Sequence, residues 1–244
     1  MIEKRNGKTI ISTPVSAADI ASLHIGDVFY LDGEMVTGRD SVHARVVIDG
    51  QKLPADIKDK VIMHAGPIVR VHDEDHSAPA ASSTSDAPHT ASSSNDVPHT
   101  ASSSSDAPHT VSYEMISIGP TTSMRMERFE YEFIQETGAR IIIGKGGMKE
   151  RTSEACKQFG AVHCVLPAGN AVIGAACVEE ITAVHWLDLG MPEAVWCCRV
   201  KELGPLIVTI DSEGRNYFEE KKRLYEQRKE EQIREISSQV HFMK

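Results

Sequence analysis

The chain lacks the cysteine patterns that hold metal clusters or disulfide frameworks. Its 244 residues include five cysteines, an odd number, and no two of them form a CxxC pair. This usage is typical of reduced thiols in a cytosolic protein. Cys197 and Cys198 are neighbours in VWCCRV, and in a strand they point to opposite faces, where they do not easily bind one metal together. The sequence therefore predicts buried thiols and no metal ligand in this chain.

Long apolar runs are also missing. The N-terminal stretch MIEKRNGKTIISTP contains no run of seven apolar residues, which argues against a secretory signal. The longest apolar stretch, residues 161–178, contains His163, Pro167 and Asn170, and it is typical of a strand, a turn and a tightly packed helix rather than of a membrane span. We expect a cytoplasmic protein with no membrane partner.

Lysine and arginine are absent from residues 72–112. Of the formal net charge of −9, this segment contributes −6, which leaves −3 for the rest of the chain. A nearly neutral remainder has no signal for the clustered basic surface that nucleic acids require. We therefore expect no nucleic-acid partner.

The same segment contains a repeat. Residues 81–110 are three copies of a ten-residue unit, ASSTSDAPHT, ASSSNDVPHT and ASSSSDAPHT. These units offer too few apolar side chains to offset the entropy lost on ordering, so we predict that residues 72–112 are a disordered, low-complexity insertion. His89, His99 and His109 recur at a fixed spacing near acids, and capture of zinc or copper stays open as an alternative.

Outside the insertion, residues 1–71 and 113–244 are expected to form one α/β domain. The first half is mostly strand-like and the second half alternates between helix and strand, which predicts a partly parallel sheet flanked by helices. We expect strands on both sides of a turn at residues 37–40, helices over about 121–137, 150–159 and 216–238, and two separate strands in AVWCCRV and LIVTID.

Three motifs in this domain offer groups that bind carboxylates. In GPTTSMRM, Thr121 and Arg125 are four residues apart, so they would share the first turn of the expected helix, whose N-terminus favours anions. In IIIGKGGM, Lys145 stands in a glycine-rich turn after a strand, although the motif fits neither the P-loop nor GxGxxG. In TGRDSVH, Arg39 follows a glycine in a turn.

Each motif also has a simpler explanation. Thr121 and Arg125 could be an ordinary helix cap and a solvated side chain, Lys145 could occupy a plain tight turn, and Arg39 could form a weak surface ion pair. Taken together, the three cations suit a small dianionic substrate. No signature of a nucleophile or of a zinc hydrolase is present.

Four stretches resemble a known family. HAGPIVR, SIGPTTSMRMERFEYEFIQETGARIIIGKGGM, VHWLDLGMPEAVWCCRVKELGPLIVTID and QVHFMK are similar to the beta subunits of L(+)-tartrate dehydratases, which are related to the C-terminal domain of class I fumarases. The resemblance covers nearly the whole chain apart from residues 72–112, and Asn170 is a further departure. It implies a swivelling β/β/α domain that completes an active site with an alpha subunit in an α2β2 assembly.

The resemblance also implies a chemistry. The alpha subunit would hold a [4Fe-4S] cluster, and the two chains would dehydrate L(+)-tartrate to oxaloacetate. Arg39, Arg125 and Lys145 would bind the substrate. Thr121 and Lys145 would be catalytic residues, with Thr121 as the base or proton relay. Two alternatives stay open: the beta subunit of a class I fumarate hydratase, and a non-enzymatic carboxylate-binding or scaffold module.

Overall fold

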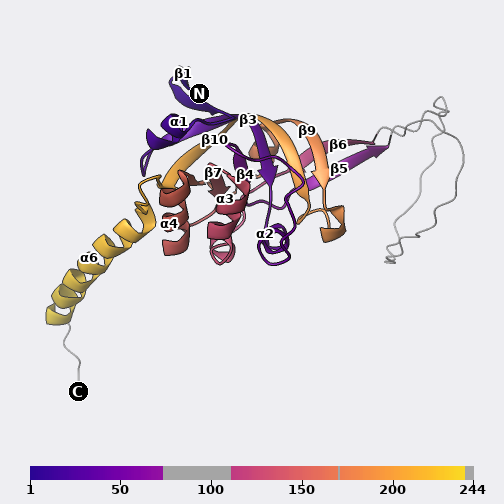
Figure 1. Cartoon of the computed structure of the whole chain (residues 1–244). Coiled ribbons are helices and arrows are strands. Elements are labelled where there is room, and N and C mark those ends of the chain that lie inside the picture. The colour runs from indigo at the N-terminus through magenta and orange to yellow at the C-terminus, as the bar shows by residue number, and fades with distance from the viewer. Residues whose placement is uncertain (74–110, 170, 240–244) are drawn as a thin grey trace, which may run out of the picture. The chain divides into compact units, whose positions relative to one another are not determined.

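The computed structural model of the protein describes residues 1–73, 111–169 and 171–239 (Figure 1). The repeat of residues 81–110, Asn170 and most of QVHFMK lie outside these ranges, so the predictions for them stay predictions. The chain divides into two compact units, one of residues 1–70 and 114–244 and one of residues 71–113. None of the described helices is both long and apolar enough to cross a bilayer.

The first unit is built on an eight-stranded sheet. The strand order is β1-β2-β3-β4-β7-β8-β10-β9. The neighbours from β2 to β8 are parallel, whereas β1 is antiparallel to β2, and β10 is antiparallel to β8 and β9. The strands are β1 (Ile2–Arg5), β2 (Lys8–Ser12), β3 (Val28–Thr37), β4 (Val61–Met63), β7 (Ile141–Gly144), β8 (Val162–Val165), β9 (Val178–His185) and β10 (Val195–Ile210).

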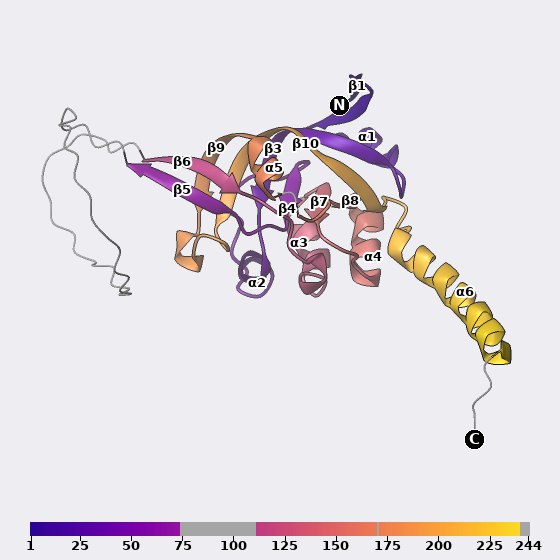
Figure 2. The same ribbon diagram turned by 180° about the vertical axis from the view of Figure 1, so that it is seen from behind.

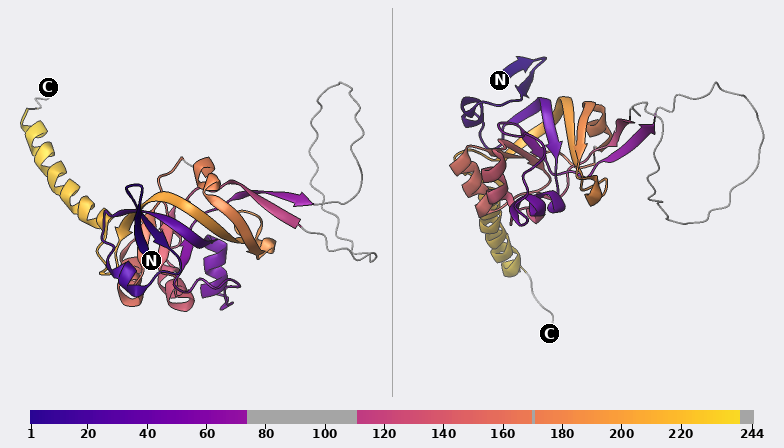
Figure 3. Two further views of the ribbon diagram at one scale, coloured as in Figure 1. Left: turned by 90° about the horizontal axis from the view of Figure 1, so that it is seen from above. Right: turned by 45° about the vertical axis from the view of Figure 1, so that its right-hand side comes forward.

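The sheet also closes on itself. β10 pairs with β3 as well as with β8, so β3, β4, β7, β8 and β10 form a closed ring of strands. Figure 3 shows the long, curved β10 running alongside β3. A mixed α/β fold with a partly parallel sheet is therefore confirmed, and closure is a feature that strand-like segments alone do not predict.

Three helices lie side by side against this sheet: α2 (Asp40–Val47), α3 (Glu130–Thr137) and α4 (Glu150–Phe159) (Figures 1 and 2). The remaining helices are α1 (Ala17–Ala21), α5 (Ala171–Ala176), α6 (Tyr217–Gln239) and the 3-10 turns η1 (Ser123–Arg125) and η2 (Leu187–Leu189). The expected helices over 150–159 and 216–238 are confirmed. α4 ends at Gly160, which adopts the left-handed conformation typical of a helix C-terminus.

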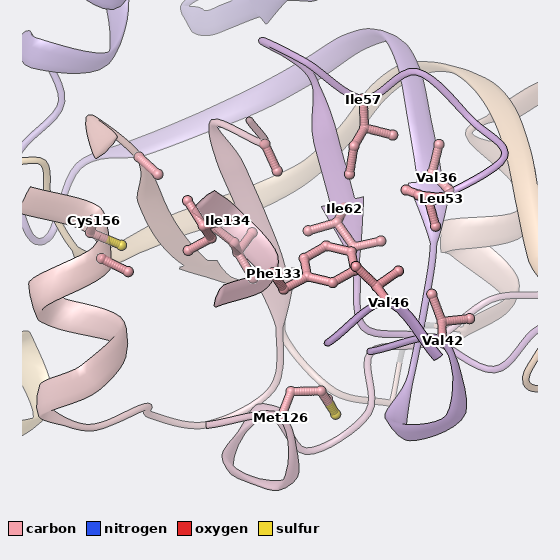
Figure 4. Packing of buried hydrophobic residues seen from close by; sticks show 14 of the residues in the cluster. Val36, Val42, Val46, Leu53, Ile57, Ile62, Met126, Phe133, Ile134 and Cys156 are labelled. Atoms are coloured by element: carbon pink, nitrogen blue, oxygen red, sulfur yellow. The ribbon is translucent and has the colours of Figure 1, made fainter. Parts of the chain in front are cut away.

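One cluster of buried hydrophobic residues in this unit lies between the sheet and the three helices. Phe133 of α3 is fully buried and points toward Ile62 of β4 and Val46 of α2 (Figure 4). All three isoleucines of β7 are fully buried as well, because a strand inside a sheet with covered faces has no solvent side. The same cluster contains Ile62 of β4 and Ile142 of β7 together with residues of α2 and α3.

Three expectations about local structure are wrong. Residues 40–47 form helix α2 rather than a strand, because Val42, His43 and Val46 follow a helical spacing that buries one face. The helix expected from residue 121 starts only at Glu130, after η1 and a turn. AVWCCRV and LIVTID belong to one strand, β10, whose register shifts let it continue without an intervening turn.

The ends of the insertion also differ from the expected boundaries. Residues 72 and 73 belong to β5 (Ile68–Asp73), and residues 111 and 112 belong to β6 (Val111–Ser117). These two strands pair in a separate two-stranded sheet. The strands therefore continue past the points where the composition changes.

Candidate active site

The candidate residues lie where two neighbouring parallel strands end. β4 ends at Met63 and β7 ends at Gly144, and the segment that follows β6 is hydrogen-bonded to both ends. The Thr121 amide donates to the His64 carbonyl oxygen at 2.6 Å, and the Lys145 amide donates to the Thr121 carbonyl oxygen at 3.0 Å. The carboxyl ends of strands are where α/β sheets bind their ligands. The backbone therefore holds Thr121 and Lys145 next to each other at this edge.

Thr121 and Arg125 meet through a different local structure from the one we expected. They precede α3 and lie around η1 rather than on one turn of an α-helix. The Arg125 Nη2 donates to the Thr121 Oγ1 at 3.3 Å and lies 2.7 Å from the Asp40 Oδ2. Because a guanidinium has five N–H donors, Arg125 keeps donors for a carboxylate ligand while it contacts both side chains.

Arg39 stands immediately before helix α2. Its Nη2 lies 3.0 Å from the Glu193 Oε1, and the other carboxylate oxygen of Glu193 accepts from the Ser41 amide at 3.1 Å. Its Nη1 is so close to Gly66 that a Cβ at that position would overlap it. Arg39 is thus connected to the other candidate residues through its neighbour Asp40, which pairs with Arg125.

Lys145 presents an exposed side chain beside these groups. Within the described residues, its ammonium forms no ion pair, in contrast to Arg39 and Arg125. Its backbone is fixed on both sides, because its carbonyl oxygen also accepts from the Ser123 amide at 3.0 Å. The arrangement combines a fixed main chain with a cation that is accessible to a ligand.

A chain of buried polar side chains lies behind this surface. The Ser123 hydroxyl is 3.1 Å from the His64 Nδ1 and 3.2 Å from the His163 Nε2, and the His163 Nδ1 is 2.7 Å from the Thr209 Oγ1. The His64 Nε2 lies 3.2 Å from the Glu130 Oε2. All five side chains are essentially inaccessible to solvent.

Burial governs the protonation of these groups. It lowers the pKa of His163 from its ordinary value to about 3 and that of His64 to about 3, and it lowers the pKa of His43 to about 4 despite the attraction of Glu130. It raises the pKa of Glu130 to about 7, although His43 opposes the shift. The three rings are therefore neutral under ordinary conditions.

The motifs of the sequence do not predict this buried chain of polar side chains, although two signals in the sequence point to it. His64 and His163 interrupt otherwise apolar strand segments, and a buried polar residue is more informative than an apolar one. Glu130 follows Met126 by four residues on the face that α3 buries. Neither signal indicates which partners these side chains contact.

A comparison with known families matches the sequence to one of them. The sequence model described as the fumarase C-terminus matches residues 3–94 and 105–221. The chain belongs to the fumarase C-terminus family. Within this family domain, the three candidate motifs and the buried histidines all lie in the matched ranges.

The relatives of this fumarase C-terminus chain include tartrate dehydratase beta subunits and a protein named as a class I fumarate hydratase. The beta subunit of L(+)-tartrate dehydratase of Escherichia coli (strain K12) is 43% identical over 97% of this chain and 100% of its own length. The corresponding protein of Shigella boydii is 42% identical over the same shares. A protein of Geobacillus stearothermophilus that is provisionally named a class I fumarate hydratase is 30% identical over 86% of this chain and 33% of its own length.

Proposed function

We propose that this chain is the beta subunit of a hydro-lyase that dehydrates L(+)-tartrate to oxaloacetate in the cytoplasm, together with an alpha subunit. The observation that carries this proposal is the position of Thr121, Arg125 and Lys145 at the carboxyl ends of β4 and β7. The 43% identity to the Escherichia coli beta subunit along that protein's whole length supports the choice of substrate.

The cations suit the charge that develops during this reaction. A proton leaves the carbon beside one carboxylate and a hydroxide leaves the next carbon, which gives an enol that tautomerises to oxaloacetate. Loss of the proton adds negative charge to a carboxylate, and fixed cations stabilise that charge more strongly than they stabilise the substrate. We assign this role to Arg39, Arg125 and Lys145.

Thr121 is the proposed base or proton relay. A threonine hydroxyl is a weak acid, so it accepts the substrate proton only if its alkoxide form is stabilised. The Arg125 Nη2, at 3.3 Å from the Thr121 Oγ1, supplies a cationic donor to that oxygen. The exposed Lys145 ammonium, whose main chain is bonded to that of Thr121, provides a second positive charge at the same edge.

The open surface of the site supports the need for a partner. The chain has a recess of about 920 Å³, but it lies between α3 and the α2–β4 connection. Thr121, Arg125 and Lys145 do not line this recess, so it does not enclose a ligand at the candidate site. Arg125 and Lys145 are exposed, whereas binding sites usually cover most of a small ligand. We propose that the alpha subunit covers this edge, in a complex with two copies of each chain.

The resemblance to iron–sulfur hydro-lyases implies a [4Fe-4S] cluster, which would accept the leaving hydroxide as a Lewis acid. The cysteines of this chain do not fit as its ligands. Cys156, Cys164 and Cys198 are buried, and burial raises the pKa of each thiol, which disfavours the thiolates that clusters require. We therefore assign the cluster to the alpha subunit.

The test is anaerobic co-expression of this chain with its alpha partner, followed by parallel assays of L(+)-tartrate and fumarate. Conversion of tartrate is expected. Conversion of fumarate alone would favour a class I fumarate hydratase, the second candidate, which the Geobacillus stearothermophilus relative supports. Activity on neither substrate, in a complex that contains an intact cluster, would refute both enzymatic proposals and favour a carboxylate-binding module.

A further inference from the structure

Three fully buried side chains converge behind the candidate active site: His43 of α2, His64 after β4, and Glu130 at the start of α3. One ligand atom from each lies within 4.8 Å of the others. The Glu130 Oε2 is 3.2 Å from the His64 Nε2 and 3.6 Å from the His43 Nε2. The three residues come from segments far apart in the sequence, and the fold brings their polar ends to one point.

The tautomer of His43 follows from its other nitrogen. The His43 Nδ1 lies 2.8 Å from the Arg39 carbonyl oxygen, which can only accept a hydrogen bond. The Nδ1 therefore carries the proton. In the neutral ring, the Nε2 then presents a lone pair toward Glu130.

The tautomer of His64 follows from the buried chain on its other side. The Thr209 hydroxyl donates to the His163 carbonyl oxygen at 3.1 Å, so it accepts from the His163 Nδ1. The His163 Nε2 is then an acceptor and takes the single hydroxyl proton of Ser123. The Ser123 oxygen therefore accepts from the His64 Nδ1, and the His64 Nε2 presents a lone pair toward Glu130.

The space between these residues is consequently lined by acceptors. The His43 Nε2, the His64 Nε2 and both carboxylate oxygens of Glu130 are buried, and none of them has a hydrogen-bond partner among the described residues. A buried polar atom without a partner destabilises the fold, and a buried charged group without a partner does so more strongly. One proton on Glu130 would serve only one of its two contacts with the histidines, and the shorter of these is the 3.2 Å contact to the His64 Nε2. The lone pair of His43 would remain without a partner.

We propose that His43, His64 and Glu130 bind one divalent transition-metal ion, with zinc as the best fit. The four unpartnered atoms supply two imidazole nitrogens and a bidentate carboxylate, which makes four donors from protein alone. Zinc accepts nitrogen and oxygen ligands in a four-coordinate site, whereas magnesium and calcium require six or more donors, mostly oxygen. The bonds from the two Nδ1 atoms to Arg39 and Ser123 orient the rings as supporting contacts do in metal sites.

The ion would have a structural role. It would tie α2, α3 and the end of β4 together, and the His64 carbonyl oxygen holds the Thr121 amide. A site with no solvent access is filled as the chain folds, so metal binding and folding are coupled. This inference does not depend on the proposed substrate or on the alpha subunit.

The test measures metal in the full chain, with a background in which His89, His99 and His109 are replaced by glutamine to remove adventitious binding at the repeat. After refolding with zinc and gel filtration, elemental analysis is expected to find about one zinc ion per chain. Refolding with cobalt is expected to give the visible ligand-field absorption of a four-coordinate site. A folded chain that holds no metal under both conditions would overturn the proposal and leave a proton as the only occupant.

Variants assign the ion to these ligands. His43→Gln and Glu130→Gln are each expected to remove the bound zinc and the cobalt absorption, whereas His24→Gln, at an exposed position, is expected to keep both. If a variant does not fold, thermal unfolding of the wild-type chain is measured with and without zinc instead. An ion that binds only the native state raises the midpoint of that unfolding. Full metal content in both variants, or no zinc-dependent shift in the wild type, would refute the assignment.

Discussion

Replacement of Arg125 by alanine separates catalysis from stability. The side chain is 43% exposed, and its ion pair with Asp40 is therefore expected to contribute at most about 1 kcal/mol to folding. Its proposed role in catalysis is larger. Loss of one fixed donor to developing negative charge typically lowers the rate by about 10²–10³-fold, or roughly 3–4 kcal/mol of transition-state stabilisation. The two effects differ enough to be measured separately.

The assay is steady-state kinetics of the complex with the alpha subunit, together with urea unfolding of the isolated variant chain. We expect Arg125→Ala to lose at least about 100-fold in kcat/KM for L(+)-tartrate while its free energy of unfolding changes by less than about 1 kcal/mol. Arg125→Lys is expected to recover only part of the rate, because an ammonium keeps the charge but not the planar donor pair.

The matched control is Arg128→Ala, which removes an exposed arginine three residues away that lies over the Phe129 ring. This control is expected to retain near-normal turnover. Near-normal turnover of Arg125→Ala would refute the assignment of Arg125 to the substrate. Equal losses in the two variants would show that the effect comes from disturbance of the segment before α3.

Three other predictions concern folding and protonation. Gly144→Ala places a Cβ over the Ser123 hydroxyl and 3.1 Å from the His64 Nδ1, and urea unfolding is expected to show destabilisation of about 1–3 kcal/mol. Phe133→Ala, at a fully buried position, is expected to cost about 3–5 kcal/mol in the same measurement, and a loss below about 1 kcal/mol would contradict the described core. The pKa of His163 is about 3 in the folded chain and 6.5 in its ordinary state, so the unfolded chain takes up the extra proton and stability falls as the pH drops below 6.5. His163→Gln is expected to make that fall shallower by up to about 1.4 kcal/mol per pH unit, and an unchanged slope would exclude a neutral, buried His163.

Several elements of the fold could be predicted from local sequence. Helices α4 and α6 were predicted within one or two residues, because periodic apolar positions and a terminal Gly160 act within a few turns of one another. Helix α2 could not be predicted in this way, since DSVHARVV is rich in β-branched residues that are typical of strands. The helical spacing of Val42, His43 and Val46 competes with this propensity, and burial of that face, with α3 packed beside α2, favours the helix.

The candidate site also has features that the sequence predicts and features that only the fold shows. Thr121, Arg125 and Lys145 could be selected from the sequence, because each stands in a short motif with a recognisable chemistry beside a strand or turn. The backbone hydrogen bond between Thr121 and Lys145 could not be predicted from the sequence, because it depends on β4 and β7 being neighbours in the sheet.

The sequence by itself determined the composition of the site, the mixed α/β class and the family that the motifs resemble. Only the tertiary structure placed His43, His64 and Glu130 around one buried point and fixed which nitrogen of each ring carries a proton. The physical reason is that local propensities act over a few residues. The protonation of a buried group depends instead on neighbours that the strand order brings to it from distant parts of the chain.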